Sequence, residues 1–187
     1  MNPVVSLQDR TFVITGAGQG IGKALVEMVI GLGGNAVAVE LNAETLNAVV
    51  ASQPPGRVLA FQGSVADPAL ANRAVADAVS AFGAVHGLVN NAGIIRPAMI
   101  EKMTDQQWQE VIDVHLTGSF FWTRAVGQHM LSRVKGGDKS GGAIVNISSD
   151  AGRKGSIGQI NYSAAKAGML AMSMTIAREW GRHNIRA

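Results

Sequence analysis

The sequence predicts a three-layer α/β fold in which helices cover both faces of a doubly wound parallel sheet. Short apolar runs alternate with longer helical patterns along the chain, and this alternation is typical of parallel strands joined by right-handed crossovers. A glycine-rich turn follows the first apolar run. With 187 residues, of which 47% are hydrophobic, the chain suffices for one substantial core, so we expect a single domain over 1–187.

Strands and helices are expected to alternate throughout. In chain order they are strand 11–15, helix 21–32, strand 36–40, helix 43–51, strand 58–62, helix 68–82, strand 85–90, helix 105–133, strand 143–148 and helix 156–182. Residues 184–187 have the pattern of the opening of a sixth strand. Ligands bind beyond the carboxyl ends of the strands in such sheets. We therefore expect the glycine turn, Asn91 and Ser149 to converge there.

Local signals support several of these boundaries. Asp67 and Pro68 have the residue types of an N-cap and a first helical position. Thr104 and Gln107 resemble a capping box at the start of the fourth helix. The glycine-rich stretch 136–142 ends the connection before the fifth strand.

The glycine-rich turn occupies residues 16–22, between the first strand and the first helix. Glycines permit a tight turn and let backbone N–H groups and the helix N-terminus approach a pyrophosphate. A second apolar strand follows, and Glu40 stands eighteen residues after Gly22, close to the spacing of an acid that binds ribose. This order of elements predicts a dinucleotide cofactor.

Tyr162 and Lys166 stand four residues apart in an expected helix. Side chains at this spacing share one helix face, so the two can act at one site. A nearby ammonium favours the phenolate form of a tyrosine, which allows Tyr162 to exchange a proton with a substrate. Ser149, thirteen residues earlier, supplies a hydroxyl that can hydrogen-bond the substrate oxygen. The three residues predict carbonyl/alcohol redox chemistry, with hydride supplied by a cofactor.

Four motifs in this order resemble those of the short-chain dehydrogenase/reductase family. They are Thr15-Gly16-x-x-x-Gly20-x-Gly22, Asn90-Asn91-Ala92-Gly93, Ser149 and Tyr162-x-x-x-Lys166. The stretch 141–169 further resembles family members that reduce 3-oxoacyl thioesters. The resemblance implies a Rossmann-like fold and an NAD(P)-dependent oxidoreductase that interconverts a secondary alcohol and a ketone, with Ser149, Tyr162 and Lys166 as catalytic residues.

The resemblance also implies a set of cofactor-binding residues. They are Gly16, Gln19, Gly20, Ile21, Gly22, Glu40, Ser64, Val65, Asn91, Ala92, Gly93, Tyr162 and Lys166. Glu40 favours NAD over NADP, because a carboxylate accepts hydrogen bonds from ribose hydroxyls but repels a 2′-phosphate. Gln19 agrees, since relatives that prefer NADP often carry a basic residue in this turn. The alternative is that Glu40 only begins a solvated loop.

His115 departs from the family pattern, which usually has asparagine at this position. In relatives that asparagine helps to hold a water in a proton relay, and a neutral imidazole can also donate and accept hydrogen bonds. His115 is therefore a fourth catalytic candidate. The alternative is a hydrogen-bonded core residue, because His115 falls on a helical stripe with Trp108, Val111, Ile112 and Ser119.

Ser64 is a second departure, at a position where relatives often have an aspartate that contacts the adenine amino group. A serine hydroxyl can make a weaker, neutral hydrogen bond there. The alternative is that Ser64 is a turn residue before the Asp67–Pro68 helix start.

Positive charge gathers in the last third of the chain. The overall net charge is +3, but residues 124–187 hold 10 Lys and Arg against 3 Asp and Glu, a net charge of +7. This asymmetry suggests that an acidic acyl carrier protein or the phosphates of coenzyme A meet the basic half, with Arg153 and Lys154 as candidate contacts. The alternative is a solvated surface. No nucleic-acid-reading motif accompanies the charge, so a nucleic-acid partner is not expected.

Composition argues against several other classes of protein. The sequence has no apolar run of about 18 residues and no signal-like N-terminus, so we expect a cytoplasmic protein without membrane contact. It has no cysteine, which excludes disulfides and thiolate metal sites, and no metal site is expected. Relatives pair two long helices about a two-fold axis, which implies a homodimer or homotetramer here.

The family resemblance also bears on the last residues. Relatives continue for several dozen residues past the sixth strand, with a turn that touches the nicotinamide and a substrate lid, so the chain is expected to lack the family's C-terminal portion. One hypothesis is an oxidoreductase whose native chain continues beyond Ala187. The other is a truncated nucleotide-binding protein without efficient catalysis.

Overall fold

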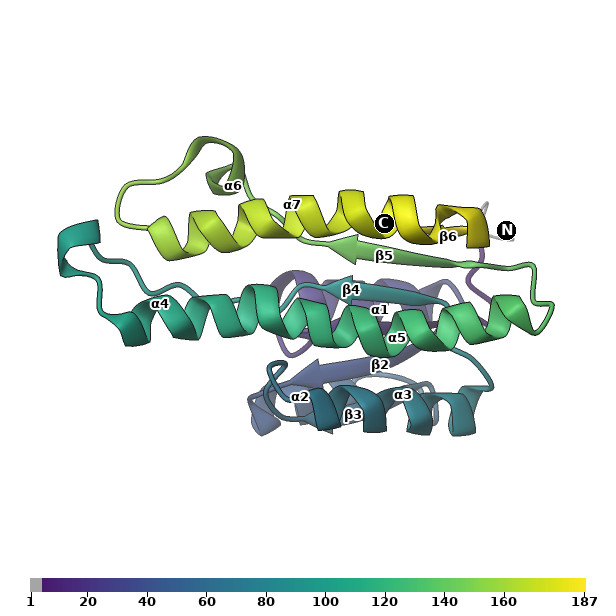
Figure 1. The fold of residues 1–187 in the computed structure, drawn as a ribbon. Helices are drawn as coiled ribbons and strands as arrows, with labels where there is room; N and C mark the ends of the chain where they lie inside the picture. The colour runs from purple at the N-terminus through teal and green to yellow at the C-terminus, as the bar shows by residue number, and fades with distance from the viewer. Residues whose placement is uncertain (1–4) are drawn as a thin grey trace.

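The computed structural model describes residues 5–187 and contains one six-stranded parallel sheet (Figure 1). The strands are β1 (Thr11–Thr15), β2 (Asn35–Glu40), β3 (Val58–Gln62), β4 (Gly87–Asn90), β5 (Gly142–Asn146) and β6 (Ile185–Arg186). Their order is β3-β2-β1-β4-β5-β6, and every neighbouring pair is parallel. The strand order reverses direction beside β1, so the predicted doubly wound parallel sheet is confirmed.

Helices cover both faces of this sheet. They are α1 (Gly20–Gly31), α2 (Ala43–Ala51), α3 (Pro68–Phe82), α4 (Asp105–Ile112), α5 (Gly118–Lys135), α6 (Ala151–Lys154) and α7 (Ile160–Trp180). Figure 1 views the molecule from the face that carries α3, α5 and α7. Successive strand residues point to opposite faces, so Val13 packs in the core under α3, α5 and α7, and Ile14 packs in the core under α1 and α2.

Local sequence signals predict the starts of two helices, α3 and α4, correctly. The Asp67 side chain accepts a hydrogen bond from Ala69 N at 2.8 Å, with Pro68 as the first residue of α3. Thr104 and Gln107 form the capping box of α4. The expected sixth strand is present as β6, which pairs with β5.

Two long helices differ from the prediction. The helix expected over 105–133 is interrupted by a π-turn at Asp113–Thr117, which separates α4 from α5, and α5 continues to Lys135. The helix expected over 156–182 begins only at Ile160, because Gly155 and Gly158 adopt φ angles of 77° and 71°, outside the helical region. Residues 151–154 form the separate short helix α6.

Two strand boundaries also differ. The strand expected over 85–90 begins at Gly87, and the strand expected over 143–148 occupies Gly142–Asn146. Residues 147–150 instead leave the sheet as the loop that carries Ser149. The last helix ends at Trp180, two residues before the predicted 182, and the remaining boundaries agree with the prediction to within one residue. The first four residues of the domain expected over 1–187 lie outside the described residues. Across 5–187 no helix is long and apolar enough to span a membrane.

Candidate active site

The N-terminus of α1 opens onto free space at the glycine turn. Within residues 5–187, the side chain of the N-cap residue Gln19 makes no capping hydrogen bond, and the first turn has no acidic residue. Gly20 has a φ of 52°, and a Cβ added there would meet no described atom within 4 Å. Helix N-terminal N–H groups without a side-chain cap can receive a pyrophosphate, so this turn fits the phosphates of a dinucleotide.

Other glycines of the turn are required by close packing of the chain on itself. A Cβ at Gly22 would collide with the carbonyl oxygen of Gly16. A Cβ at Gly16, whose φ is 65°, would lie 2.8 Å from Ala92 Cα. The turn therefore packs directly against the segment that follows β4, where Ala92 lies.

Asn91 joins the ends of β1 and β4. Its Nδ2 donates to the carbonyl oxygens of Thr15 at 3.0 Å and of Gly16 at 3.2 Å. The Thr15 hydroxyl in turn accepts from the backbone N–H groups of Asn91 and Ala92, at 3.0 and 3.1 Å. These bonds hold the two adjacent carboxyl ends of the sheet together, beside the glycine turn.

Glu40 ends β2 with its carboxylate turned toward the glycine turn. One carboxylate oxygen accepts from Gly18 N at 3.1 Å, and the other accepts from Leu41 N at 2.9 Å and Asn42 N at 3.1 Å. The side chain is half-buried and is fixed by these backbone groups. It therefore presents a fixed negative charge next to the turn.

A cleft of about 300 Å³ gathers most of the predicted cofactor-binding residues. It is lined by Gly16, Gln19, Glu40, Ser64, Val65, Asn91, Ala92 and Gly93, which the sequence predicted, and by Val39, Leu41, Gly63, Ile94 and Val114, which it did not. Of the unpredicted residues, Val39, Leu41, Gly63 and Ile94 each adjoin a predicted one in the sequence. Val114 comes from the π-turn, and no sequence signal pointed to it.

Ser64 is a turn residue, as its second alternative predicted, and its contact with adenine stays a prediction. Its hydroxyl accepts from Ala66 N at 3.2 Å and its carbonyl oxygen accepts from Asp67 N at 3.1 Å, as expected of a turn residue before α3. It also lines the cleft.

Lys166 is buried at the carboxyl end of β5, with only 3% of the residue exposed. Its Nζ donates to the carbonyl oxygen of Ile147 and lies 3.7 Å from Met169 Sδ. Burial lowers the pKa of the ammonium to about 8. The Nζ atom also lies 5.6 Å from the centroid of the Tyr162 ring, so the predicted pair shares one face of α7.

Ser149 lies in the loop between β5 and α6, and this loop packs on the turn of α7 that holds Lys166. The Ser148 hydroxyl donates to the Lys166 carbonyl oxygen at 2.8 Å. A Cβ at Gly152 would lie 2.7 Å from the carbonyl carbon of Lys166. Ser149 Oγ itself accepts from Ala151 N at 3.2 Å. The loop is thereby held beside the catalytic candidates of α7.

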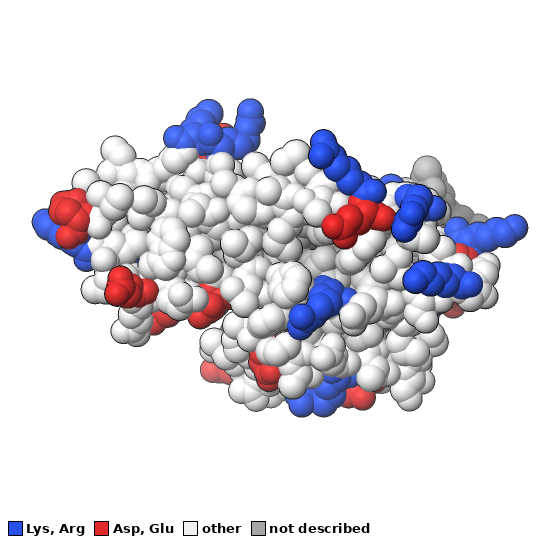
Figure 2. Space-filling view, viewed as in Figure 1, with Lys and Arg blue, Asp and Glu red and all other residues white. Residues whose placement is uncertain are grey.

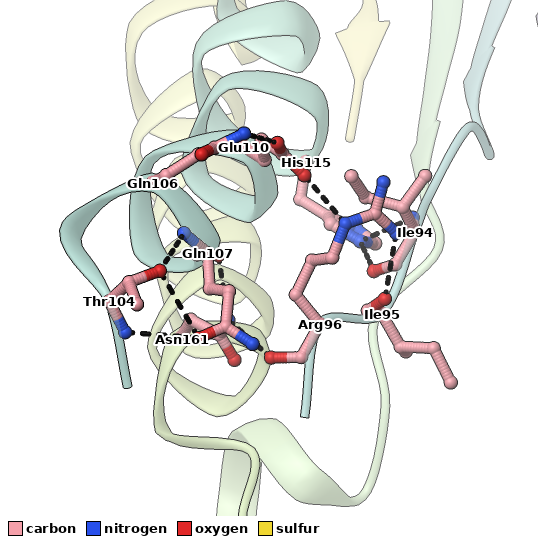
Figure 3. Close-up of polar contacts among 9 residues, drawn as sticks. All are labelled: Ile94, Ile95, Arg96, Thr104, Gln106, Gln107, Glu110, His115 and Asn161. Atoms are coloured by element: carbon pink, nitrogen blue, oxygen red, sulfur yellow. Dashed lines mark hydrogen bonds and ion pairs between the residues drawn. The ribbon is translucent and has the colours of Figure 1, made fainter. Parts of the chain in front are cut away.

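His115 lies in the π-turn, with 1% of the residue exposed. Its Nε2 is 2.8 Å from the Ile94 carbonyl oxygen and 3.0 Å from Ile94 N (Figure 3). Its ring meets the Tyr162 ring edge to face, with centroids 5.2 Å apart. Burial lowers the pKa of the imidazole to about 4, the hydrogen bond with the Ile94 backbone opposes this, and the Lys166 charge adds to it. A neutral His115 is therefore a hydrogen-bonded core residue that also touches Tyr162.

The stripe predicted for His115 is only partly buried. Val111 and Ser119 are buried with His115, whereas Trp108 is 38% exposed. The π-turn adds a residue to the helical repeat, which changes the face presented before and after it.

Comparison with known proteins places these features in one family. Residues 10–187 match the family model described as short chain dehydrogenase. The chain is 37% identical over 182 residues to the 3-oxoacyl-[acyl-carrier-protein] reductase FabG of Thermotoga maritima, covering 96% of this chain and 72% of that protein. It is 36% identical over 191 residues to the hydroxyacyl-CoA dehydrogenase ChsB1 of Mycobacterium tuberculosis, covering 96% of this chain and 59% of that protein.

Solved structures show the same relationship. A short chain dehydrogenase from Mycobacterium avium matches with a TM-score of 0.88 and 34% identity, covering 96% of this chain and 65% of that chain. This chain thus spans about two thirds of the length of that structure and less of ChsB1.

Proposed function

The chain belongs to the short-chain dehydrogenase family and is an oxidoreductase of that family, and we propose that it interconverts a 3-oxoacyl thioester and the corresponding 3-hydroxyacyl thioester with NAD(H). The observation that carries this proposal is the buried Lys166 ammonium beside the Tyr162 ring, on one face of α7. The proposal places cofactor binding and catalysis in one domain.

The catalytic roles follow from the chemistry of each side chain. The nicotinamide, when bound, supplies or accepts the hydride. Tyr162 donates a proton to the substrate oxygen during reduction and accepts it during oxidation, and Lys166 stabilises the phenolate. Ser149 hydrogen-bonds the substrate oxygen and orients it toward Tyr162. We assign His115 to the site as the residue that touches the Tyr162 ring and holds Ile94 at the edge of the cleft.

Residues of the cleft would hold the cofactor. The N-terminus of α1, beside the cleft residues Gly16 and Gln19, would receive the pyrophosphate, and Glu40 would accept hydrogen bonds from the adenosine ribose. Tyr162 and Lys166 do not line the cleft. We assign to them a contact with the ribose on the nicotinamide side of the cofactor, on the basis of their chemistry. Glu40 supports NAD over NADP because its fixed carboxylate would repel a 2′-phosphate.

The substrate class rests on the relatives and on surface charge. Two proteins similar to this chain are named 3-oxoacyl-[acyl-carrier-protein] reductase, and another is named hydroxyacyl-CoA dehydrogenase. Figure 2 shows basic side chains gathered over α6, where Arg153 is exposed and Lys154 pairs with Asp150 at 2.9 Å. These cations suit the phosphates of coenzyme A or an acidic carrier protein. Charge reversal at Arg153 and Lys154 that leaves the thioester KM unchanged would reject this contact.

An apolar groove between α5 and α7 supports association of identical chains. Its lining includes Phe120, Met172 and Trp180, and Phe120 is 47% exposed. We infer that a second copy covers this face in a homodimer or homotetramer. A monomeric mass in solution at micromolar concentration would contradict that inference.

The experiment that tests the proposed function is a cofactor and substrate comparison on one sample of known intact mass. NADH oxidation is followed with a 3-oxoacyl thioester and with a polyol-derived ketone, and each reaction is repeated with NADPH. We expect turnover with the thioester and a higher kcat/KM for NADH. Turnover only with the polyol-derived ketone would reject the substrate class, and a preference for NADPH would reject the role of Glu40. NADH binding without turnover of any ketone would favour a nucleotide-binding protein.

A further inference from the structure

Asn161 is a fully buried polar residue next to Tyr162, and the catalytic roles above do not use it. It is 0% exposed and is the second residue of α7. Burial of an amide is costly unless its hydrogen-bonding groups find partners. The contacts of Asn161 therefore indicate what the residue does.

All of the hydrogen-bonding groups of the Asn161 side chain have partners, and Figure 3 shows the contacts with Arg96 and Gln107. Its Nδ2 donates to the carbonyl oxygen of Arg96 at 3.1 Å and to that of Gln107 at 2.9 Å. Its Oδ1 accepts from Tyr162 N at 2.8 Å. An amide offers two donor hydrogens and one acceptor oxygen, and Asn161 uses each of them on backbone.

The three partners belong to three separate segments. Gln107 lies in the first turn of α4, where the capping box with Thr104 fixes it. Arg96 lies in the connection between β4 and α4, two residues after Ile94, which lines the cofactor cleft. Tyr162 lies in the first turn of α7. Asn161 therefore joins the start of the catalytic helix to the edge of the cleft.

The segment 94–96 is held at each end by a buried side chain that neighbours Tyr162. His115 contacts the backbone of Ile94 and the Tyr162 ring, whereas Asn161 contacts the Arg96 carbonyl and the Tyr162 N–H. The Arg96 side chain adds an ion pair with Glu110, at 2.6 Å. In contrast, the N-cap residue of α7, Gln159, makes no side-chain capping bond among the described residues.

We propose that Asn161 is a positioning residue, which holds the first turn of α7, and with it the Tyr162 phenol, at a fixed place relative to the segment 94–96 that borders the cofactor cleft. This inference rests on the proposed function, in which Tyr162 exchanges a proton with the substrate. Misplacement of a reacting group by about 1 Å can lower a rate by about 10²-fold. Loss of Asn161 should therefore displace Tyr162 and so lower kcat.

Two variants and one control test this role. Asn161→Ala removes the three hydrogen bonds, and Asn161→Asp keeps the shape but turns carboxylate oxygen toward the Arg96 and Gln107 carbonyls. If one variant does not fold, the other still gives the result. Gln106→Ala is the matched control, because Gln106 belongs to the same polar cluster but is exposed, and its side chain donates to the Glu110 side chain at 2.8 Å.

The chain contains a single tyrosine, which allows a readout that does not depend on activity. Incorporation of 3-fluorotyrosine places one ¹⁹F nucleus on Tyr162. We expect Asn161→Ala and Asn161→Asp to shift or broaden this signal and to lower kcat by about 10²-fold, with the dissociation constant for NADH within about twofold of wild type. The control should change neither the signal nor kcat.

The outcomes separate this proposal from the proposed function. A ¹⁹F signal that does not move in folded Asn161 variants overturns the positioning role, whatever the activity. A kcat within about twofold of the control overturns it as well, because Tyr162 would then not need the contact. If wild-type protein reduces no ketone, the proposed function fails, and the ¹⁹F signal still decides whether Asn161 holds Tyr162.

Discussion

The Lys166 Nζ atom lies 5.6 Å from the centroid of the Tyr162 ring, and both side chains project from the same face of α7. The ammonium is buried at this position and donates to the Ile147 carbonyl oxygen. Its charge is therefore screened little by water. This pair is the physical basis of the reaction that we assign to the chain.

Replacement of Lys166 by methionine should abolish most of the activity. Methionine fills a similar volume but carries no charge, so a phenolate on Tyr162 loses its stabilising cation. We expect kcat to fall by about 10² to 10⁴-fold, measured as the initial rate of NADH oxidation with a saturating ketone. Lys135→Met, at an exposed position near the end of α5, is the control and should leave kcat unchanged. Equal rates for the two variants would remove Lys166 from the mechanism.

Glu40→Gln should shift cofactor preference toward NADPH. Glutamine keeps an oxygen that can accept from Gly18 N, but it removes the charge that repels a 2′-phosphate. We expect the ratio of kcat/KM for NADH to that for NADPH to fall by about tenfold, since a hydrogen bond to a charged group contributes about 1.5–3 kcal/mol. Glu44→Gln, in the first turn of α2, is the control. An unchanged ratio in Glu40→Gln would show that Glu40 has no part in the choice of cofactor.

His115→Phe tests the two roles of the imidazole together. Phenylalanine can keep the ring contact with Tyr162 but removes Nε2, which bonds either the N–H or the C=O of Ile94 according to the tautomer. We expect the free energy of unfolding to fall by about 1–3 kcal/mol and kcat to fall at least about tenfold. His115→Asn should restore part of kcat because its amide can again donate and accept. If His115→Phe is destabilised but keeps the kcat of wild type, His115 is a core residue with no part in catalysis.

Stability should fall in mild acid because histidines near the amino ends of the strands act as neutral acceptors. His86 Nδ1 accepts from Thr11 N at 3.2 Å, and His129 Nε2 accepts from Val85 N at 3.1 Å. Burial lowers the pKa of His86 to about 4, and the Arg133 and Arg10 charges add to this, whereas Asp138 opposes it. Burial also lowers the pKa of His129.

The direction of the effect follows from proton binding. A histidine whose folded pKa lies below its unfolded value binds more protons in the unfolded chain, so its contribution is complete above about pH 6.5 and is lost as the pH falls toward 4. We expect the step from pH 7 to pH 5 to cost about 1–2 kcal/mol through His86 alone. Urea unfolding of His86→Asn, whose side chain can accept without titrating, should show a smaller loss than wild type over this range. An equal loss in both proteins would exclude His86 as the cause.

Local signals were enough to predict most of the fold from the sequence. The Asp67 cap, the capping box at Thr104 and the apolar strands each depend on residues a few positions apart, and the structure contains them. The π-turn at Asp113–Thr117 and the break before Ile160 were missed. Both depend on backbone angles and packing partners that the apolar pattern does not reveal.

The site was predictable where short motifs carry the chemistry. Residues of the glycine turn, Asn91 and Glu40 line one cleft because parallel strands end at the same edge of the sheet. Ser149, which was expected to converge with the glycine turn and Asn91, is not among the residues that line this cleft. Asn161 and Val114 were missed because their contacts come from segments distant in sequence. Asn161 bonds residues 65 and 54 positions away, and only the folded chain brings them together.

Tyr162→Phe in a single-turnover assay tests the central claim most directly. Wild-type protein and the variant, each with bound NADH, are mixed with a 3-oxoacyl thioester, and the loss of NADH absorbance is followed in time. Phenylalanine preserves the ring and its packing on His115 but removes the proton donor. We expect the rate constant to fall by at least about 10²-fold while NADH still binds with wild-type affinity. A rate constant near that of wild type would contradict the assignment of Tyr162 as the acid and base of the reaction.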